Sequence, residues 1–241
     1  MTTVVQTLTC FIIPRKAVRY ILFQRTHYLL PKIRVVKFFY RALMNFFPKT
    51  TVLVLSYLFQ TKIKSSYIED MNSEFNICHK YLGLLDCKNI LDIGCGIAGI
   101  DVLLYKGLLS NPSLFLLDKS EEKKIYYRFR EEGAFYNSLN ITKEVLISNG
   151  IPENKIYILE ANNFRIPFST DFDLIISLLS WGFHYPISTY LESVYSKMIE
   201  GGILIVDIRK GTNGIERLQE KFNNIEIIHE THSYLRIKAI K

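Results

Sequence analysis

The sequence predicts an α/β protein with a seven-stranded mixed sheet and helices on both faces. From residue 66 onward, short apolar runs of strand length alternate with longer segments of helical pattern. The last two apolar runs, Ile225–Glu230 and Tyr234–Ile240, follow each other closely, as in an antiparallel hairpin. With 241 residues, of which 49% are hydrophobic, the chain can build one large domain with an appendage. Strands that alternate with helices pair in parallel, so the closing hairpin makes the predicted sheet mixed.

Residues 1–65 are predicted to form a basic, aromatic, helical extension or cap. Residues 1–68 contain no Asp or Glu but eleven Lys or Arg, whereas the remainder has a net charge of −4. The overall net charge of +7 therefore belongs to the N-terminal segment, which indicates an anionic partner surface. Polar residues interrupt the apolar stretch Val4–Ile13, and no clear cleavage site follows it, so we expect no secretory signal.

Two apolar segments bear on what this extension contacts. Lys32–Phe47 has the pattern of an amphipathic helix, with basic residues on one side and phenylalanines on the other. Thr51–Phe59 contains the longest apolar run, which is far shorter than the roughly 20 residues of a membrane-spanning helix. Three interpretations stay open: a helical cap packed on the following domain, contact with an anionic membrane interface, and binding of nucleic acid. The first two are compatible with each other.

A glycine-rich turn organises the domain that follows. Ser66–Leu85 is predicted to be a helix and Asn89–Ile93 the first strand. The chain then runs through Gly94-Cys95-Gly96-Ile97-Ala98-Gly99 into a helix over Gly99–Leu109. Glycines let the backbone turn sharply and approach a ligand, and the helix start supplies unpaired N–H groups. The glycine spacing fits the G-x-G-x-x-G of dinucleotide sites, and a turn without a ligand is also compatible with it.

Asp92 lies two residues before the first glycine, which gives Leu91-Asp92-Ile93-Gly94-Cys95-Gly96. This L-D-I-G-C-G stretch resembles motif I of the class I S-adenosyl-L-methionine (SAM)-dependent methyltransferases. The resemblance implies a Rossmann-like methyltransferase domain over residues 66–241 and SAM as the cofactor. It also implies a cofactor site that includes Asp92, Gly94, Cys95 and Gly96. Rossmann dehydrogenases rarely carry an acidic residue at this position, so SAM is favoured over a dinucleotide.

The second predicted strand, Ser113–Asp118, ends in a carboxylate about one βαβ unit after the glycines. A carboxylate offers two acceptor oxygens to the ribose hydroxyls of a nucleoside. The resemblance puts Asp118 in the family's ribose-binding position, with a helix-capping role as the alternative, and adds Lys119 to the cofactor site. Gly133–Asn137 is predicted to be a loop beside the site, where Phe135, Tyr136 and Asn137 could reach substrate or cofactor, or serve packing.

The third predicted strand, Lys155–Glu160, leads into a second stretch that carries the resemblance. The sequence from Ala161 to Phe168 resembles the family's G-D-A-x-x-L-P-F segment, in which the acidic residue contacts the adenine amino group. Asn162 takes the place of that acid, and its amide oxygen can still accept a hydrogen bond. Asn163, together with Ser177 at the end of the next strand, completes the predicted cofactor site.

Phe172-Asp173-Leu174-Ile175 resembles the family's fourth strand, and the segment up to Pro186 resembles its active-site loop. The segment lacks the D/N-P-P-Y of adenine and glutamine N-methyltransferases and the cysteine of 5-methylcytosine chemistry. His184 is the candidate general base because the pKa of imidazole suits proton removal near neutrality, and an ordinary packed histidine is the alternative. Tyr185 is the candidate hydrogen-bond donor to substrate. Trp181 and Phe183 are expected to wall the cofactor or substrate pocket.

Four further segments complete the predicted order of elements. Three are helices, over Thr142–Asn149, Ser188–Ile199 and Glu216–Phe222, and Thr142 is the expected N-cap of the first. The fourth is the fifth strand, Ile203–Asp207. Asp207, at the end of that strand, is a weaker alternative base.

The sequence as a whole predicts a SAM-dependent methyltransferase that methylates a hydroxyl of a small molecule or sugar. Oxygen is favoured because the N- and C-methylation signatures are absent. RNA methylation through the basic segment is a second hypothesis, and a non-catalytic module that binds a membrane or a protein partner is a third. Four cysteines without a C-x-x-C pair indicate a reduced, cytoplasmic protein without a metal site. The basic segment leaves peripheral association with a membrane open.

Overall fold

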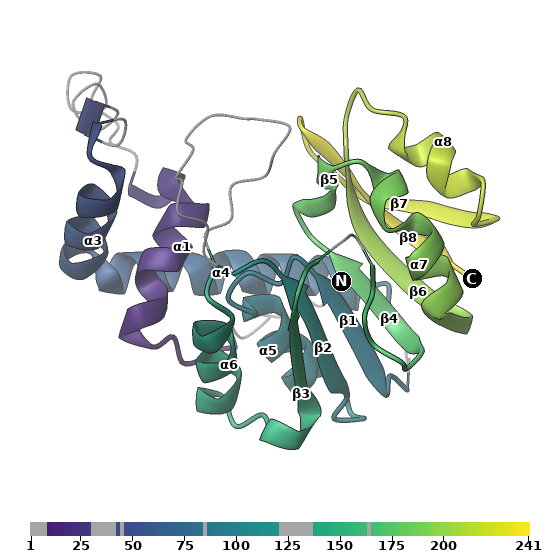
Figure 1. Cartoon of the computed structure of the whole chain (residues 1–241), viewed down its shortest axis with the longest axis horizontal. Helices are drawn as coiled ribbons and strands as arrows, with labels where there is room; N and C mark the ends of the chain where they lie inside the picture. The colour runs from purple at the N-terminus through teal and green to yellow at the C-terminus, as the bar shows by residue number, and fades with distance from the viewer. Residues whose placement is uncertain (1–8, 30–41, 44–45, 84–85, 121–136, 163–164) are drawn as a thin grey trace, which may run out of the picture.

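The computed structural model describes residues 9–29, 42–43, 46–83, 86–120, 137–162 and 165–241. Its sheet has seven strands in the order β3-β2-β1-β4-β6-β8-β7, so the predicted seven-stranded mixed sheet is confirmed. The neighbouring strands from β3 to β6 pair in parallel, whereas β8 is antiparallel to both β6 and β7 (Figure 1). The strands are β1 (Asn89–Ile93), β2 (Ser113–Asp118), β3 (Ile156–Glu160), β4 (Phe172–Ser177), β6 (Met198–Arg209), β7 (Asn224–Glu230) and β8 (Tyr234–Ile240).

Helices cover both faces of the sheet, and each face has its own hydrophobic core. Alternation along β1 divides the side chains: Ile90 enters one core and Leu91 the other, because successive residues of a strand point to opposite faces. The helices of the first core are α1 (Val18–Gln24), α3 (Pro48–Leu58), α4 (Gln60–His79), α5 (Gly99–Gly107) and α6 (Leu139–Ser148). Those of the second core are α7 (Leu191–Lys197) and α8 (Gly214–Gln219).

The described part of the N-terminal segment packs on the first core. In α1, Val18, Ile21 and Leu22 are fully buried and share a core with the sheet residues Leu114 and Leu174. The helix α4 crosses the predicted domain boundary between residues 65 and 66. Most of the amphipathic helix predicted over residues 32–47 lies outside the described residues. No described helix is both long enough and apolar enough to cross a membrane.

Several predicted elements differ from the structure. The helices predicted over residues 66–85 and 216–222 lie at Gln60–His79 and Gly214–Gln219. The predicted active-site loop is partly a strand, β5 (Ser180–Tyr185), because Gly182 lets the backbone come close to β6: a Cβ atom at this position would lie 2.7 Å from the Asp207 carbonyl. The helix expected to start at Thr142 begins one turn earlier, at Leu139. The helix predicted over residues 188–199 is shorter, since the chain becomes extended at Met198, where β6 begins.

Candidate cofactor site

The turn after β1 is shaped by two glycines with left-handed backbone. Gly94 has a φ of +85° and Gly96 a φ of +54°, a region that other residues rarely adopt. A Cβ atom on Gly94 would lie 1.9 Å from Ser180 Oγ, so a larger residue does not fit there. The Gly94 N–H donates a hydrogen bond to the Leu117 carbonyl of β2 at 2.7 Å. The turn is therefore fixed against both β2 and the start of β5.

Asp118, the last residue of β2, contacts the same turn. Its Oδ2 accepts hydrogen bonds from the Gly96 N–H at 2.8 Å and from Asn137 Nδ2 at 3.0 Å. Its Oδ1 accepts a hydrogen bond from the Lys119 N–H at 2.7 Å. Burial raises the pKa of Asp118 to about 6, and these donors act in the opposite direction. An ionised carboxylate thus lies beside the glycine turn at neutral pH, with a further lone pair on Oδ1.

Two side chains near the start of α6 hold the carbonyl of Gly96. Asn137 Nδ2 donates to this oxygen at 2.6 Å, and Thr142 Oγ1 donates to it at 2.7 Å. Ser138, rather than Thr142, is the N-cap residue of α6, so the predicted cap at Thr142 is wrong. Thr142 instead lies inside the first turn of the helix and fixes the glycine turn. Phe135 and Tyr136, predicted beside Asn137, lie outside the described residues.

Asp92 and Asp101 form a pair of buried carboxyl groups at the base of the turn. Asp92 lies on β1 and Asp101 in the first turn of α5, and no hydrogen bond of good geometry reaches either Asp101 oxygen within the described structure. Burial, followed by the charge of Asp101, raises the pKa of Asp92 well above its usual range. Burial also raises the pKa of Asp101 to about 7. The pair therefore holds a proton at neutral pH.

The N-terminal segment reaches the glycine turn through α1. A Cβ atom on Gly96 would lie 3.1 Å from Gln24 Oε1, so Gln24, the last residue of α1, lies directly against the turn. The chain after α1 is anchored to α4 through Asp70 Oδ2. This oxygen accepts hydrogen bonds from Arg25 Nη1 at 3.0 Å and from the Tyr28 hydroxyl at 2.5 Å. The candidate site is thus built partly by the extension.

The other predicted cofactor residues lie at different distances from the turn. Cys95 is buried within it, and its Sγ is 4.0 Å from Asp118 Oδ2. Burial raises the pKa of the Cys95 thiol well above its usual value, so the thiol stays protonated. Asn162 is exposed just after β3, and Asn163 lies outside the described residues. The structure therefore brings Cys95 next to Asp118, while Asn162 faces solvent.

Ser177 connects β1 with the start of β5. Its hydroxyl donates a hydrogen bond to the Ile93 carbonyl at 2.7 Å and accepts one from the Trp181 N–H at 3.0 Å. Trp181 is fully buried, and its Nε1 donates to the Ile187 carbonyl at 2.8 Å. The expectation that Trp181 walls a pocket is therefore wrong. Both side chains hold the β4–β5 connection in place.

The two predicted catalytic residues lie at the end of β5. His184 is exposed, and its ring contacts Phe183 edge-on with the ring centroids 4.9 Å apart. Partial desolvation and the Arg209 guanidinium lower the pKa of His184, so the imidazole is neutral at pH 7 and can accept a proton. Tyr185 follows on the same strand and is half-buried.

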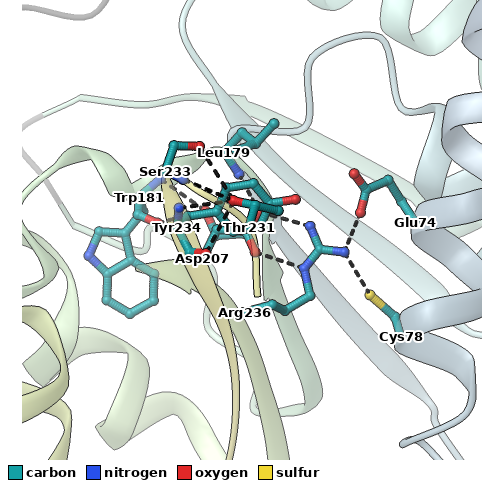
Figure 2. A network of polar contacts seen from close by, with 10 residues as sticks. Glu74, Cys78, Leu179, Trp181, Asp207, Thr231, Ser233, Tyr234 and Arg236 are labelled. Atoms are coloured by element: carbon teal, nitrogen blue, oxygen red, sulfur yellow. Dashed lines mark hydrogen bonds and ion pairs between the residues drawn. The ribbon is translucent and has the colours of Figure 1, made fainter. Parts of the chain in front are cut away.

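A second buried polar group ties α4 to the sheet (Figure 2). Arg236 of β8 forms two hydrogen bonds to Asp207 of β6, from Nε to Oδ1 at 2.7 Å and from Nη2 to Oδ2 at 2.9 Å. Its Nη1 forms an ion pair with Glu74 of α4. Asp207 Oδ2 also accepts a hydrogen bond from the N–H of Leu179 at 3.0 Å, and Leu179 has a left-handed φ of 54°. Both carboxylate oxygens of Asp207 thus accept hydrogen bonds within the protein, which favours a structural role over that of a base.

No group of three or more His, Cys, Asp or Glu side chains that could hold a metal ion occurs within the described part of the chain. The polar groups that converge at the ends of β1 and β2 are instead carboxylates and backbone amides around a glycine turn. In doubly wound sheets, ligands bind at this edge, where the strand order reverses. In this sheet the order reverses between β1 and β4.

No protein-family model matches the sequence, and no curated protein is significantly similar to it. Several solved methyltransferases have a similar structure. One is a protein of Nostoc punctiforme PCC 73102 that is assigned as an O-methyltransferase, with 14% identity, a TM-score of 0.52 and coverage of 70% of this chain. The match spans 56% of the Nostoc protein.

Two further similar structures belong to methyltransferases whose names state two different substrates, a precorrin and an rRNA. The precorrin-6y C5,15-methyltransferase of Geobacter metallireducens GS-15 has 17% identity and a TM-score of 0.51, and the match covers 70% of this chain and 88% of that protein. The 16S rRNA N2 G1207 methyltransferase of T. thermophilus, solved with AdoMet (SAM) and guanosine, has 12% identity and a TM-score of 0.50, with coverages of 71% and 42%. Together with the strand order, these likenesses confirm the prediction that the chain has the class I SAM-dependent methyltransferase fold.

Proposed function

We propose that this protein binds SAM at the glycine turn and transfers its methyl group to an acceptor. The observation that carries the proposal is the contact between Asp118 and Gly96: an ionised carboxylate at the end of β2 is bonded to the backbone of a glycine turn at the end of β1. This arrangement offers a carboxylate to ribose hydroxyls and places a Cβ-free turn where a nucleoside has to come close.

The residues present fit SAM in two further respects. SAM carries an electrophilic methyl group on a positively charged sulfonium. Asp92 and Asp101 supply buried acidic groups at the base of the turn, and burial is the main cause that raises the pKa of both. Gln24 adds an amide from the N-terminal segment beside Gly96. Asp118 would hold the ribose, and the Asp92–Asp101 pair would favour a cationic cofactor by charge.

We further propose that the acceptor atom is a hydroxyl oxygen of a small molecule or sugar. A hydroxyl loses its proton as it attacks the methyl carbon, so a neutral imidazole nearby is a suitable base. His184 supports this role because its lowered pKa keeps the ring neutral at pH 7. Tyr185 would orient the acceptor by donating a hydrogen bond. The segment that contains both residues lacks the signatures of N- and C-methylation.

Replacement of Asp118 by alanine tests the cofactor assignment. We expect the affinity for SAM, measured by isothermal titration calorimetry, to fall about 100-fold, because charge-assisted hydrogen bonds are lost from a buried site. The matched control is Asp171→Ala, which removes an exposed carboxylate before β4, at the opposite end of the parallel strands. Equal affinities in Asp118→Ala and the wild type would contradict the proposal.

Replacement of His184 by glutamine tests the proposed base. We expect turnover of a hydroxyl acceptor to fall by about 100-fold while the affinity for SAM stays unchanged, because general-base catalysis contributes factors of this size. Fractions of a small-molecule extract serve as the source of acceptor, and turnover is measured as the S-adenosylhomocysteine that is released. Mass spectrometry then locates the methyl group on the acceptor. His229→Gln, on β7, is the matched control. Unchanged turnover in His184→Gln would exclude this histidine as the base.

RNA is the second candidate acceptor. It is favoured by one observation: α1, which belongs to the acid-free basic segment, ends at Gln24 against the glycine turn. A methyltransferase that uses this segment to bind RNA would lose affinity steeply as the salt concentration rises. Methyl transfer from labelled SAM to an RNA fraction, but not to the small-molecule fraction, would favour RNA over a hydroxylated small molecule.

A further inference from the structure

The outer side of α3 and the residues just before it expose large apolar side chains. The residue Phe46 is 78% exposed and Leu58 is 63% exposed, values usual for charged residues and uncommon for large hydrophobic ones. We define the α3 face by the exposed residues of this region, namely Leu43, Phe46, Phe47, Leu53, Val54, Tyr57, Leu58 and Phe59. Exposed apolar side chains that gather on one part of a protein indicate an interaction site.

The spacing of these residues separates the α3 face from the packed side of the helix. Val52 is fully buried in the core that it shares with residues of α1 and α4, and Ser56 is also buried. Val54 and Leu58 are four residues apart, so they lie on one exposed side of the helix. Figure 1 places α3 at the end of the molecule opposite the β7–β8 hairpin. The helix is thus apolar on both sides, and only its inner side is covered by described residues.

Exposed basic side chains accompany the α3 face, and the sequence of the segment that builds it contains no acidic residue. Lys49 and Lys62 are exposed on α3 and α4. Arg15 is also exposed, and its Cζ lies 4.4 Å from the centroid of the Tyr57 ring. Residues 1–68 contain eleven Lys or Arg and no Asp or Glu. Apolar and aromatic residues flanked by basic side chains form the kind of surface that an anionic lipid interface binds.

We propose that the α3 face docks on the surface of an anionic phospholipid membrane. A second copy of this chain is a poorer occupant, because it would bring two acid-free basic segments together. RNA is also a poorer occupant, since a phosphate backbone pairs with basic groups and leaves Phe46, Val54 and Leu58 unused. The proposal does not depend on the proposed methyl transfer, because none of these residues lies at the glycine turn.

Vesicle flotation of the full chain tests this proposal. The probes are vesicles of phosphatidylcholine alone and vesicles with about 30 mol % phosphatidylglycerol, each at about 0.1 M and about 0.5 M NaCl. We expect the wild type to float with the anionic vesicles and to lose part of this binding at the higher salt concentration. Phe46→Ser/Leu58→Ser is expected to lower the partition coefficient at least about tenfold, because the protein loses two apolar side chains that would be buried in the membrane interface.

A matched variant separates this surface from exposed apolar residues in general. Leu109→Ser/Ile227→Ser removes two side chains with 98% and 54% exposure from other parts of the molecule, and we expect its binding to equal that of the wild type. Lys49→Glu/Lys62→Glu is expected to weaken binding to the anionic vesicles only. Thermal melting and SAM titration of each variant report folding and the cofactor site independently.

The proposal is overturned if the wild type binds neither kind of vesicle, or if both double serine variants lose binding equally. A concentration-dependent dimer that Phe46→Ser/Leu58→Ser abolishes, without any vesicle binding, would assign the α3 face to a second copy. Salt-sensitive binding to RNA without vesicle binding would assign the basic segment to nucleic acid.

Discussion

Two buried acidic groups lie at the carboxyl ends of the parallel strands, and they differ in whether a cation accompanies them. Asp207, at the end of β6, is fully buried and accepts two hydrogen bonds from Arg236. Asp92 and Asp101, at the β1 turn, are similarly buried, and among the described residues no ion pair reaches either of them. A buried charge is costly unless it is paired, so within the described structure the first group has its counter-charge and the second has none.

This difference separates a structural group from a ligand-binding one. Arg236 joins Asp207 of the sheet to Glu74 of α4, and α4 in turn anchors the chain after α1. The pairing thus holds the helices that lie over the cofactor turn. The Asp92–Asp101 pair lies between β1 and α5 without an ion pair to any described residue, next to the proposed site of a cationic cofactor. We therefore expect a substitution that breaks the paired group to lower the free energy of unfolding. We expect a substitution that neutralises an acid of the unpaired group to raise it.

The largest expected effect comes from removing the cation of the paired group. Arg236→Met keeps much of the side-chain volume but leaves Asp207 and Glu74 without a counter-charge. We expect the free energy of unfolding to fall by about 3–5 kcal/mol, as is usual when one partner of a buried ion pair is removed. Urea denaturation followed by circular dichroism measures this change.

Arg217→Met is the control for that measurement. Arg217 pairs with Glu220 at 2.9 Å on α8, and both side chains are about half exposed. Removing an exposed pair of this kind is expected to change the free energy of unfolding by less than about 1 kcal/mol. A similar, small effect of both substitutions would show that the buried pairing does not hold α4 on the sheet.

The sheet was predictable because its signals are local. Strand β1 was predicted with its observed bounds, since an apolar run ends at a glycine turn, and Asp118 was located as the acid that ends the next strand. Each signal lies within a few residues of the element it defines. The exposed α3 face was not predicted, because apolar residues that pack on α1 and those that face solvent look alike in sequence.

The polar contacts could not be predicted because they join distant parts of the chain. Arg236 and Glu74 are 162 residues apart, and no spacing rule connects them. Thr142 was predicted as a helix cap because threonine is a common N-cap residue, whereas its hydroxyl contacts Gly96, 46 residues earlier. Asp101 follows Asp92 by nine residues, and only the packing of α5 on β1 makes the two carboxyl groups a pair. Such contacts depend on the tertiary arrangement of elements.

A smaller effect of opposite sign is expected from the unpaired group. The pKa of Asp101 is about 7 in the folded chain and about 4 in an unfolded one, so the folded state binds more protons between these values. The free energy of unfolding of the wild type should therefore fall as the pH rises from about 4 to about 7. In Asp101→Asn the amide stays neutral, so we expect a flatter pH dependence and a gain in stability at pH 8. The gain should be smaller than the roughly 4 kcal/mol of a three-unit shift, because burial still raises the pKa of Asp92 in the variant.

Urea denaturation across this pH range measures the difference, with the exposed Asp171→Asn as the control. Identical pH dependence in Asp101→Asn and the wild type would show that the two carboxyl groups do not share a proton. The same variant also tests what the unpaired acid is for. If the pair serves a cationic cofactor, Asp101→Asn should bind SAM more weakly although it is more stable, because the charge that destabilises the free protein is the one that attracts the ligand.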